Sequence, residues 1–226
     1  MTEKIKIGLL GKGRTGSKVI EVYGAENIIA FDQENPPTLE KLKQADVLIS
    51  FLPGEAIFEY IDVIIESKVP LASGGTGFVW PSDINDRLKK NGITWITSSN
   101  FAIGMSLVKA MVEQLSKADV LFDETEYKLH EIHHIYKKDH PSGTGLTMEK
   151  WLGHKVSFSH ERDGDNPGEH KLTLVTPYEE ISIEHKSLDR KIFANGAIWA
   201  AKRLLRGDLK PGLHELSDLT AKEIGL

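Results

Sequence analysis

Apolar and polar positions change their period along the chain, and this change divides it into two parts. Over the first hundred residues, short apolar or β-branched runs predict strands at residues 4–10, 27–31, 46–52, 69–72 and 93–97. Between them, helical periods predict helices at residues 17–23, 55–67 and 82–91. Strands and helices that alternate through short links are typical of a doubly wound parallel sheet. Only 13 residues separate Asp32 from Asp46, so the second crossover connection is expected to be small.

The pattern of the second part is different. Polar and apolar residues alternate, or β-branched residues dominate, without helical periods between them, which predicts strands within residues 120–136 and 171–185. Such strands favour a mostly antiparallel sheet. Helices are predicted before it, inserted in it and after it, at residues 103–117, 144–152 and 197–205.

These patterns predict an α/β protein of two domains. Residues 1–102 and 195–226 are expected to form a Rossmann-type domain with a doubly wound parallel sheet, and residues 103–194 an α+β domain. The antiparallel sheet of the second domain would have open edges, and such edges favour the assembly of several copies.

A glycine-rich loop joins the first predicted strand to the first predicted helix. It consists of Gly11, Lys12, Gly13, Arg14, Thr15 and Gly16. The spacing Gly-x-Gly-x-x-Gly between a strand and a helix is typical of dinucleotide-binding domains. Gly11 permits the tight turn, Gly13 lets the backbone approach a pyrophosphate, and Gly16 allows the helix to pack close to the strand. The N-terminus of the helix then faces the phosphates.

Asp32 follows the second predicted strand, 16 residues after Gly16. An acidic residue at about this distance from the loop usually binds the ribose hydroxyls of the adenosine. Gln33 and not an arginine comes next, so a 2′-phosphate would meet a carboxylate without an adjacent cation. We therefore expect NADH to be preferred over NADPH as the cofactor.

Two further loops follow predicted strands and contain residues that can contact a nicotinamide. They comprise Gly74, Gly75 and Thr76 in one loop, and Ser98, Ser99, Asn100 and Phe101 in the other. Ligands of doubly wound sheets bind beyond the carboxyl ends of the strands. The alternative is ordinary turn chemistry, in which glycine and asparagine simply permit positive φ. Because both loops fall where a nicotinamide would lie, we favour cofactor binding.

Composition excludes several classes of protein. The net charge of −5 and the pI near 6.0 argue against a nucleic-acid binder. The chain has no cysteine, which excludes a thiol nucleophile, a cysteine-bound zinc ion and any disulfide. No apolar run approaches the roughly 20 residues that span a bilayer, and the first strand pattern begins too early to leave room for a signal peptide. We expect a soluble, cytoplasmic protein without a membrane partner.

Residues 131–145 carry the most informative side chains of the chain, in the order Glu-Ile-His-His-Ile-Tyr-Lys-Lys-Asp-His-Pro-Ser-Gly-Thr-Gly. His133 and His134 belong to the one residue type whose charge ordinarily changes near neutral pH, and Lys137 follows closely. The Gly143-Thr144 turn can offer backbone N–H groups to an anion. Together they predict a site that protonates a small anionic substrate and holds its carboxylate. The alternative is a histidine-rich surface strand that ends in a turn.

The same region matches His-Glu-x-x-His, the pattern of zinc peptidases, through His130, Glu131 and His134. That motif works on a helix, where residues four apart share a face and reach one Zn²⁺. The surrounding segment has no clear helical period, and in a strand residues four apart lie about 13 Å from one another. We therefore expect a strand here and no metal ion.

The run at 131–144 resembles the signature of the 4-hydroxy-tetrahydrodipicolinate reductases (dihydrodipicolinate reductases) of lysine biosynthesis. In that family the pattern is Glu-x-His-His-x-x-Lys-x-Asp-x-Pro-Ser-Gly-Thr, and every fixed position is present here. Other family-like segments lie at residues 74–78, 100–104, 162–170 and 190–197. The resemblance implies a reductase that uses NADH or NADPH, acts on a small dicarboxylate in lysine and diaminopimelate biosynthesis, and forms a homotetramer through the domain that also binds the substrate.

The resemblance also implies roles for individual residues. His133 and Lys137 would be the catalytic residues that transfer protons, and the substrate carboxylates would be held by His134, Ser142, Gly143 and Thr144. Hydride addition to an imine-type ring needs a proton delivered alongside, which a positioned histidine or lysine can supply. We expect the strand to end near His134, so that the long Lys137 side chain folds back into the cleft.

The chain departs from the family pattern in three ways. It is short, with residues missing between Asp32 and Asp46. Gly75 stands where the usual Gly-Thr-Thr-Gly loop has a threonine, and Asp163 replaces a glycine. Two rival interpretations stay open: another amino-acid dehydrogenase of the same two-domain build, such as an aspartate or diaminopimelate dehydrogenase, and a non-catalytic NAD-binding sensor.

Overall fold

The computed structural model describes residues 5–52 and 54–225. They form two compact units, each with its own sheet. The first unit contains the chain up to Phe101 together with Arg190–Leu219, and the second contains Ala102–Asp189 together with the residues from Thr220 onward. The assignment of one part to dinucleotide binding and of the other to substrate binding stays a prediction at this point.

The sheet of the first unit has six strands in the order β10-β5-β4-β3-β1-β2, and all neighbouring strands are parallel. They are β1 (Ile7–Leu10), β2 (Ile28–Phe31), β3 (Val47–Ser50), β4 (Leu71–Ser73), β5 (Thr94–Thr97) and β10 (Gly212–Glu215). β1 and β3 are buried at every position, as expected of a parallel sheet covered on both faces. The predicted doubly wound sheet is confirmed. β10 was not predicted, because Gly-Leu-His-Glu contains a single large apolar residue.

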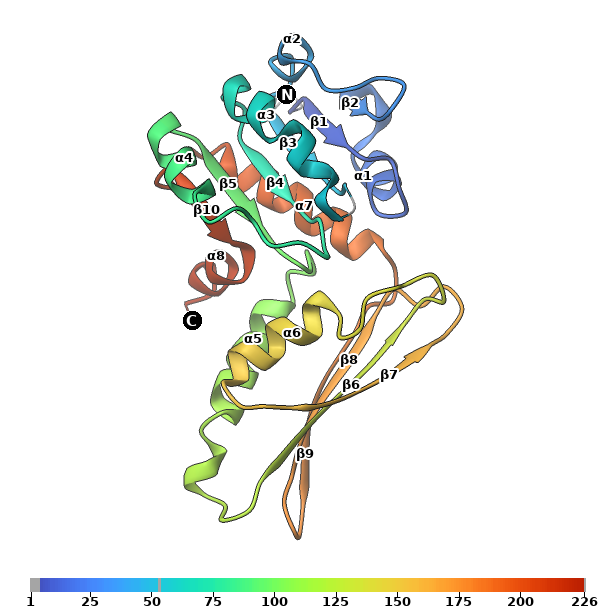
Figure 1. Ribbon diagram of the computed structural model, residues 1–226, viewed down its shortest axis with the longest axis vertical. Helices are drawn as coiled ribbons and strands as arrows, with labels where there is room; N and C mark the ends of the chain where they lie inside the picture. The colour runs from blue at the N-terminus through green and yellow to red at the C-terminus, as the bar shows by residue number, and fades with distance from the viewer. Residues whose placement is uncertain (1–4, 53, 226) are drawn as a thin grey trace. The chain divides into compact units, whose positions relative to one another are not determined.

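Helices cover both faces of this sheet (Figure 1). One face packs against α1 (Gly16–Tyr23) and α7 (Lys191–Leu204), and the other against α2 (Leu39–Leu42), α3 (Ile61–Ser67) and α4 (Ile84–Asn91). The predicted helix at residues 55–67 is a 3-10 helix, Gly54–Tyr60, followed by α3. The second crossover is small, as predicted, because α2 is a single turn. A further helix, α8 (Leu216–Glu223), follows β10 and was not predicted.

Small side chains bring α7 close to the sheet. Ala194, Ala197 and Ala200 are fully buried in the core on this face, and a Cβ on Gly196 would lie 1.7 Å from the carbonyl oxygen of Phe101. The helix was predicted to begin at residue 197, whereas it begins at Lys191. Close packing on the sheet therefore outweighs the low intrinsic helix propensity of Gly196.

The second unit has a four-stranded sheet in the order β7-β6-β8-β9. β6 pairs with β8, and β8 with β9, in antiparallel register, while β6 and β7 are parallel, so the predicted mostly antiparallel sheet is confirmed. Its strands are β6 (Glu126–His133), β7 (Ser157–Arg162), β8 (Glu169–Val175) and β9 (Glu180–Lys186). β7 was not predicted. The single stretch predicted at residues 171–185 is a hairpin, closed by a hydrogen bond from Thr176 N to Glu179 O of 3.0 Å.

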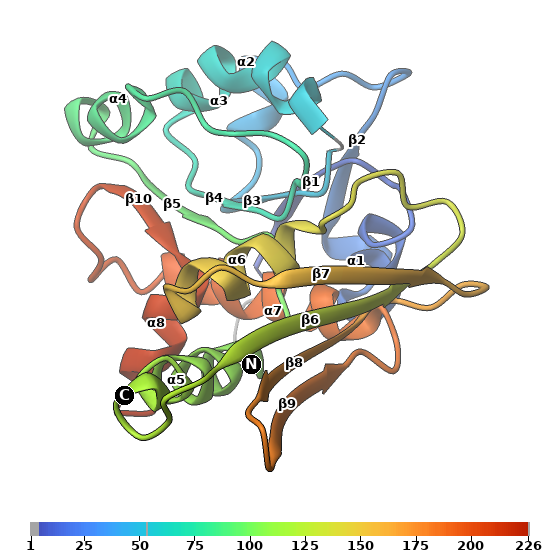
Figure 2. The ribbon, with the colours of Figure 1, turned by 60° about the horizontal axis from the view of Figure 1, so that its bottom comes forward.

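Two helices of this unit, α5 (Met105–Leu115) and α6 (Gly143–Leu152), lie side by side next to the sheet (Figure 1; Figure 2 gives a second view). Burial alternates strictly along β6 because these helices cover one face of the sheet. Tyr127, Leu129, Glu131 and His133 are buried, while the positions between them are more exposed. The buried face is thus apolar at the start of β6 and polar at its end, where the candidate site lies.

Candidate active site

The three predicted cofactor loops meet at one edge of the first unit's sheet. Leu10 is in register with Ser50, Ser50 with Ser73, and Ser73 with Thr97. These residues end β1, β3, β4 and β5, and the strands are parallel, so their carboxyl ends lie in a row. The loops at residues 11–16, 74–76 and 98–101 follow directly. Within this unit, the fold therefore groups residues far apart in the sequence where doubly wound sheets bind ligands.

The backbone of the glycine loop is closely packed at Gly11 and Gly16, whereas there is free space beside Gly13. Gly11 has a φ of 91°, and its N–H donates to Phe31 O at 3.1 Å. A Cβ on Gly16 would lie 1.9 Å from Gly11 O, whereas a Cβ on Gly13 would meet no described atom within 4 Å. α1 begins at Gly16, so its first-turn N–H groups belong to the same loop. This backbone fits a pyrophosphate, because Gly13 leaves room for close approach.

Asp32 closes a turn and binds a cation. Its Oδ1 accepts hydrogen bonds from Glu34 N at 3.0 Å and Asn35 N at 2.8 Å, and its Oδ2 lies 2.5 Å from Lys12 Nζ. The hydrogen bond from Lys12, together with the backbone N–H groups, holds the pKa of Asp32 below its usual value. The sequence places no cation next to Asp32, yet the fold brings the Lys12 ammonium to it from the glycine loop.

Aromatic packing explains both glycines of the loop after β4. A Cβ on Gly74 would lie 2.5 Å from the Phe51 ring, and one on Gly75 would lie 2.7 Å from the Phe78 ring. Phe51 meets Phe101 edge to face, with ring centroids 6.0 Å apart, and Phe101 is buried in the core. Phe51 was not singled out in the sequence, because nothing marks it beyond its place after a strand.

The loop after β5 is held by Ser98. Its hydroxyl donates to Asn100 O at 2.7 Å and accepts from Asn100 N at 3.1 Å. Ser98 N also donates to Ser73 O at 3.1 Å, which links this loop to the end of β4. The hydrogen bonds of this loop are those of an ordinary turn, and the loop also lies at the carboxyl edge of the sheet. The two alternatives considered for it in the sequence are therefore compatible.

In the second unit, a buried carboxylate lies near the end of β6. Glu131 is fully buried, and both its oxygens accept from Ser142 N at 3.1 Å. Its Oε1 lies 3.3 Å from His140 Nδ1. Burial acts to raise the pKa of Glu131, but the hydrogen bonds from Ser142 and His140 outweigh burial and hold that pKa below its usual value. Glu131 is therefore a buried anion that ties β6 to the loop before α6.

His133 is the last residue of β6 and is 6% exposed. A Cβ on Gly168 would lie 3.2 Å from its Nε2. Its Nδ1 lies 4.0 Å from Glu131 Oε1 and has no hydrogen-bond partner among the described residues. Burial, and then the positive charges of Lys137 and Arg162, lower the pKa of His133 to about 4. The imidazole is therefore neutral at pH 7 in this structure.

Lys137 lies in a turn directly after the strand. β6 ends at His133, as expected, and Lys137 N donates to His134 O at 3.1 Å. The ammonium binds both oxygens of Asp139, at 2.8 and 2.7 Å. Arg162 of β7 fixes this loop, because its Nε donates to Lys137 O at 3.2 Å and its Nη2 to Asp139 O at 3.0 Å. The loop that carries the Lys137 ammonium is thus held by hydrogen bonds from Arg162.

The N-terminus of α6 lies next to this cluster. Ser142 is the N-cap, and its Oγ accepts from Gly145 N at 3.0 Å and lies 3.1 Å from His170 Nε2. Its side chain is 1% exposed, so the hydroxyl and the amide of Ser142 both bind protein groups. Gly143 and Thr144 begin α6, and the N-terminal end of a helix favours an anion. His134 follows the strand and its ring lies 6.3 Å from that of Tyr136.

The zinc-peptidase interpretation fails on geometry. His130 and Glu131 are consecutive residues of the strand β6 and lie on its opposite faces, and His130 contacts Ser159 Oγ at 2.8 Å. The segment is a strand, as expected. A different trio, Glu131, His133 and His170, has donor atoms within 4.8 Å of one another, close enough to be compared with metal sites. Glu131 accepts from Ser142 N and contacts His140, and His170 contacts Ser142 Oγ, so we interpret this trio as part of a hydrogen-bonded cluster.

Comparison with known proteins decides the family. A family model described as dihydrodipicolinate reductase, C-terminus, matches residues 104–220. Over 229 residues the chain is 32% identical to the 4-hydroxy-tetrahydrodipicolinate reductase of Bdellovibrio bacteriovorus, with 96% of each chain covered. This chain belongs to the dihydrodipicolinate reductase family. It is also 32% identical to the protein of the same name from Alkaliphilus oremlandii, over 77% of this chain and 79% of the relative.

Solved structures agree on the fold. A dipicolinate-bound dihydrodipicolinate reductase from Paenisporosarcina sp. TG-14 matches with a TM-score of 0.71 and 18% identity, over 96% of this chain and 100% of the other. A diaminopimelate dehydrogenase of C. glutamicum matches with a TM-score of 0.52 and 11% identity, over 96% and 94%, which is likeness of fold alone. The near end-to-end match with the Bdellovibrio relative also indicates that a short chain is not peculiar to this member of the dihydrodipicolinate reductase family.

His170 is the main residue of the site that the sequence did not reveal. It is 2% exposed on β8, opposite Glu131 in the sheet register. The only signal was its position at the end of a family-like segment, residues 162–170, because pairing between β6 and β8 was needed to bring it to the cluster. Arg162 was noted in the same segment, but its bonds to the Lys137 loop follow from the parallel pairing of β7 with β6.

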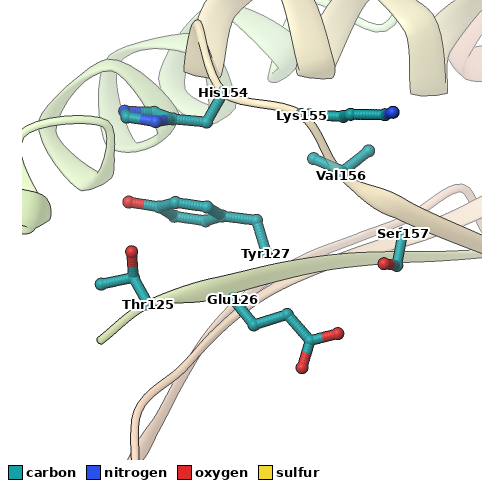
Figure 3. Close-up of a pocket in the computed structure, with 7 residues that line it drawn as sticks. All are labelled: Thr125, Glu126, Tyr127, His154, Lys155, Val156 and Ser157. Atoms are coloured by element: carbon teal, nitrogen blue, oxygen red, sulfur yellow. The ribbon is translucent and has the colours of Figure 1, made fainter.

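A pocket of about 320 Å³ lies at the start of β6, at the opposite end of this strand from His133 (Figure 3). The ring of Tyr127 stacks on that of His154, with centroids 5.0 Å apart. The hydroxyls of Tyr127 and Thr125 both donate to Asp119 Oδ1 at 2.9 Å. Burial and the bond to Asp119 raise the pKa of Tyr127 to about 12. Because these groups bind one another, we interpret the residues around this pocket as a structural contact between β6 and the end of α6.

Proposed function

We propose that this protein catalyses the NAD(P)H-dependent reduction of 4-hydroxy-tetrahydrodipicolinate to tetrahydrodipicolinate in lysine and diaminopimelate biosynthesis. Family membership supports the reaction. The observation in this chain that supports the reaction is the position of the buried His133, which lies next to the loop that contains Lys137 and near the N-terminus of α6. The balanced reaction consumes NAD(P)H and one proton and releases NAD(P)⁺ and water, so it needs both a proton donor and a binding site for a dicarboxylate.

His133 and Lys137 are the proposed proton-transferring residues. A neutral His133 cannot donate the reaction's proton before it is charged, and a bound dicarboxylate supplies the negative charge that favours its protonation. The Lys137 ammonium is bound by Asp139, and a substrate carboxylate can compete for it with equal charge. Substrate binding would then place both acids in their charged forms.

The substrate carboxylates are proposed to bind His134 and the first turn of α6 at Gly143 and Thr144, where N–H groups favour anions. Ser142 was expected to bind the substrate as well. Its amide and hydroxyl hold Glu131, Gly145 and His170, which supports a role in shaping the loop.

The cofactor is proposed to bind at the carboxyl edge of the parallel sheet. The open side of Gly13 and the helix start at Gly16 fit a pyrophosphate, and Asp32 would take the ribose hydroxyls. The nicotinamide, which supplies the hydride when bound, would lie at Gly74, Gly75 and Thr76 and at residues 98–101. We infer a preference for NADH because of Asp32, and some use of NADPH because Lys12 Nζ lies 2.5 Å from that carboxylate and can meet a 2′-phosphate.

We also infer a homotetramer that works in the cytoplasm. β7 and β9 form the open edges of the four-stranded sheet, and large apolar side chains are exposed near β9, among them Tyr178 and Ile181. Such edges favour pairing between copies. Among the described helices, none is long and apolar enough to cross a membrane. Light scattering during size-exclusion chromatography gives the mass, and a monomer at micromolar concentration would contradict the assembly.

The decisive experiment is a coupled assay with freshly generated 4-hydroxy-tetrahydrodipicolinate, first with NADH and then with NADPH. We expect steady oxidation of the cofactor only when the substrate is present, with higher kcat/KM for NADH. Cofactor binding without turnover would favour the NAD-binding sensor. Turnover of aspartate or diaminopimelate with NAD(P)⁺, without reduction of the cyclic imine, would favour the rival dehydrogenases.

A further inference from the structure

The buried Glu131 carboxylate lies between the proposed acid and the proposed anion-binding loop. Its oxygens accept from Ser142 N, at the start of α6, and its Oε1 lies 4.0 Å from His133 Nδ1. A carboxylate has about four lone-pair positions, so Glu131 can bind Ser142 and His140 and still accept one more hydrogen bond. The Nδ1 atom of His133 is buried without such a bond among the described residues.

We propose that Glu131 is a positioning residue for His133: when this imidazole is protonated, its Nδ1–H closes onto the Glu131 carboxylate, while the same carboxylate holds the α6 loop through Ser142 N–H. The inference rests on the proposed function, in which His133 gains and loses a proton. A rotation of the ring or of the carboxylate that brings the two atoms about 1 Å closer converts the 4.0 Å approach into a charge-assisted hydrogen bond.

The surroundings of His133 make such a counter-ion necessary. Positive or positively chargeable groups face the ring from three elements: His134 and Lys137 after β6, Arg162 on β7 and His170 on β8. The negative groups are Asp139, which is bound to Lys137, and Glu131. Since Asp139 is 41% exposed at its side chain and Glu131 is 0% exposed, Glu131 is the less screened of the two anions.

The arrangement also couples the acid to the anion-binding loop. Ser142 N donates to Glu131, and Ser142 Oγ contacts His170, whose ring lies against that of His133. Movement of the Glu131 carboxylate toward His133 therefore acts on the residue that begins α6. We expect substitutions of Glu131 to change both the pKa of His133 and the affinity for a dicarboxylate.

Three variants test the proposal, each compared with the wild-type protein. E131Q keeps the shape and one acceptor for Ser142 N but removes the charge, and E131D keeps the charge. The matched control is E161Q, which removes a carboxylate from the adjacent strand β7 that pairs with His130 on the other side of the sheet. The pKa of His133 is measured by NMR of labelled imidazoles, and the affinity for dipicolinate by calorimetry, so neither readout needs turnover.

We expect E131Q to lower the pKa of His133 by about one unit or more, as loss of a close opposite charge does, and to weaken dipicolinate binding about tenfold. E131D should restore part of both, and E161Q should change neither. A His133 pKa in folded E131Q within about 0.3 units of wild type would overturn the proposal.

A second measurement needs no variant. In the wild type, acidification through the pKa of His133 should produce a downfield Nδ1–H resonance, the signature of a hydrogen bond to a carboxylate, and its absence would overturn the proposal even if E131Q does not fold. If the wild type fails to reduce the cyclic imine but shows this resonance, the proposed function fails and the contact with Glu131 stands. If the wild type reduces the cyclic imine but does not show this resonance, the proposed function stands and the contact with Glu131 fails.

Discussion

The imidazole rings of His133 and His170 meet edge to face, with centroids 5.0 Å apart and planes inclined by 75°. Burial lowers the pKa of His133 to about 4 and that of His170 to about 3, and a charge on either ring opposes a charge on the other. Two imidazoles this close in a buried site cannot both be charged at low cost. We therefore expect the pair to carry at most one positive charge, and in the proposed function it is His133, near Lys137 and Glu131, that carries it.

Removal of either proposed acid should lower kcat and leave cofactor binding nearly unchanged. We expect His133→Gln and Lys137→Ala each to reduce kcat by about 10²–10⁴, the usual worth of acid–base catalysis. The measurements are steady-state rates and the Kd for NADH. His130→Gln, on the opposite face of the same strand, is the control and should keep its activity. Full activity in either His133→Gln or Lys137→Ala would refute the assignment, and so would loss of wild-type activity on treatment with a chelator, because no metal is expected.

The pH dependence of the reaction should differ between free enzyme and substrate complex. A general acid with a pKa of about 4, as His133 has without substrate, loses its proton above that pH, so kcat/KM should fall as pH rises through this region. A bound dicarboxylate raises the pKa, and the corresponding limb of kcat should lie at higher pH. Rate profiles with saturating and limiting substrate measure the two values. Coincident limbs would contradict a role of substrate charge in the protonation of His133.

The polarity pattern predicted the sheets and the order of the functional loops, because burial on both faces gives apolar runs and burial on one face gives alternation. It also predicted that the segment with His130 and His133 is a strand and not a helix. These inferences depend on the period of neighbouring residues alone. The end of this strand near His134 was expected instead from the roles that the family resemblance implies for His133 and Lys137.

The polarity pattern could not predict which strands pair or which distant residues come into contact. His170 reaches the site only because β8 pairs antiparallel with β6, so that it lies opposite Glu131. Lys12 meets Asp32 only because β1 and β2 are neighbours and bring their loops together. The role of Glu131 was hidden for the same reason, since its partner Ser142 is 11 residues away and in another element. Such residues can be seen in the sequence, but the groups that each of them contacts are known only from the tertiary structure.

Acid should destabilise the protein partly through His170. Its pKa is lowered to about 3 in the folded state, against about 6.5 when unfolded. Because the unfolded chain binds the proton first as pH falls below 6.5, the folded state loses stability between pH 6.5 and 3. Near pH 4.5 the loss attributable to this residue is on the order of 3 kcal/mol.

The test is urea unfolding at pH 7.5 and pH 4.5. His170→Gln removes the titrating group, so the difference in free energy of unfolding between the two pH values should be smaller in the variant than in the wild type. His214→Gln is the control, because this histidine belongs to the other unit's sheet and its ring contacts Lys210 O at an exposed position. An equal pH difference in wild type and His170→Gln would show that His170 does not titrate as proposed.

Lys12 and Asp32 should set the cofactor preference in opposite directions. The carboxylate repels a 2′-phosphate and accepts from the ribose hydroxyls of NADH, while the ammonium attracts a 2′-phosphate. We expect Asp32→Asn to raise the ratio of kcat/KM for NADPH to that for NADH by about tenfold, and Lys12→Ala to lower it by a similar factor, because each variant removes one charge–charge contact with the 2′ position of the cofactor. Lys18→Ala, which removes an exposed lysine of α1 that pairs with Glu21, should leave the ratio unchanged. Opposite shifts in the two variants with an unaltered control would locate the 2′ position of the cofactor at this ion pair, whereas an unchanged ratio in both would place it elsewhere.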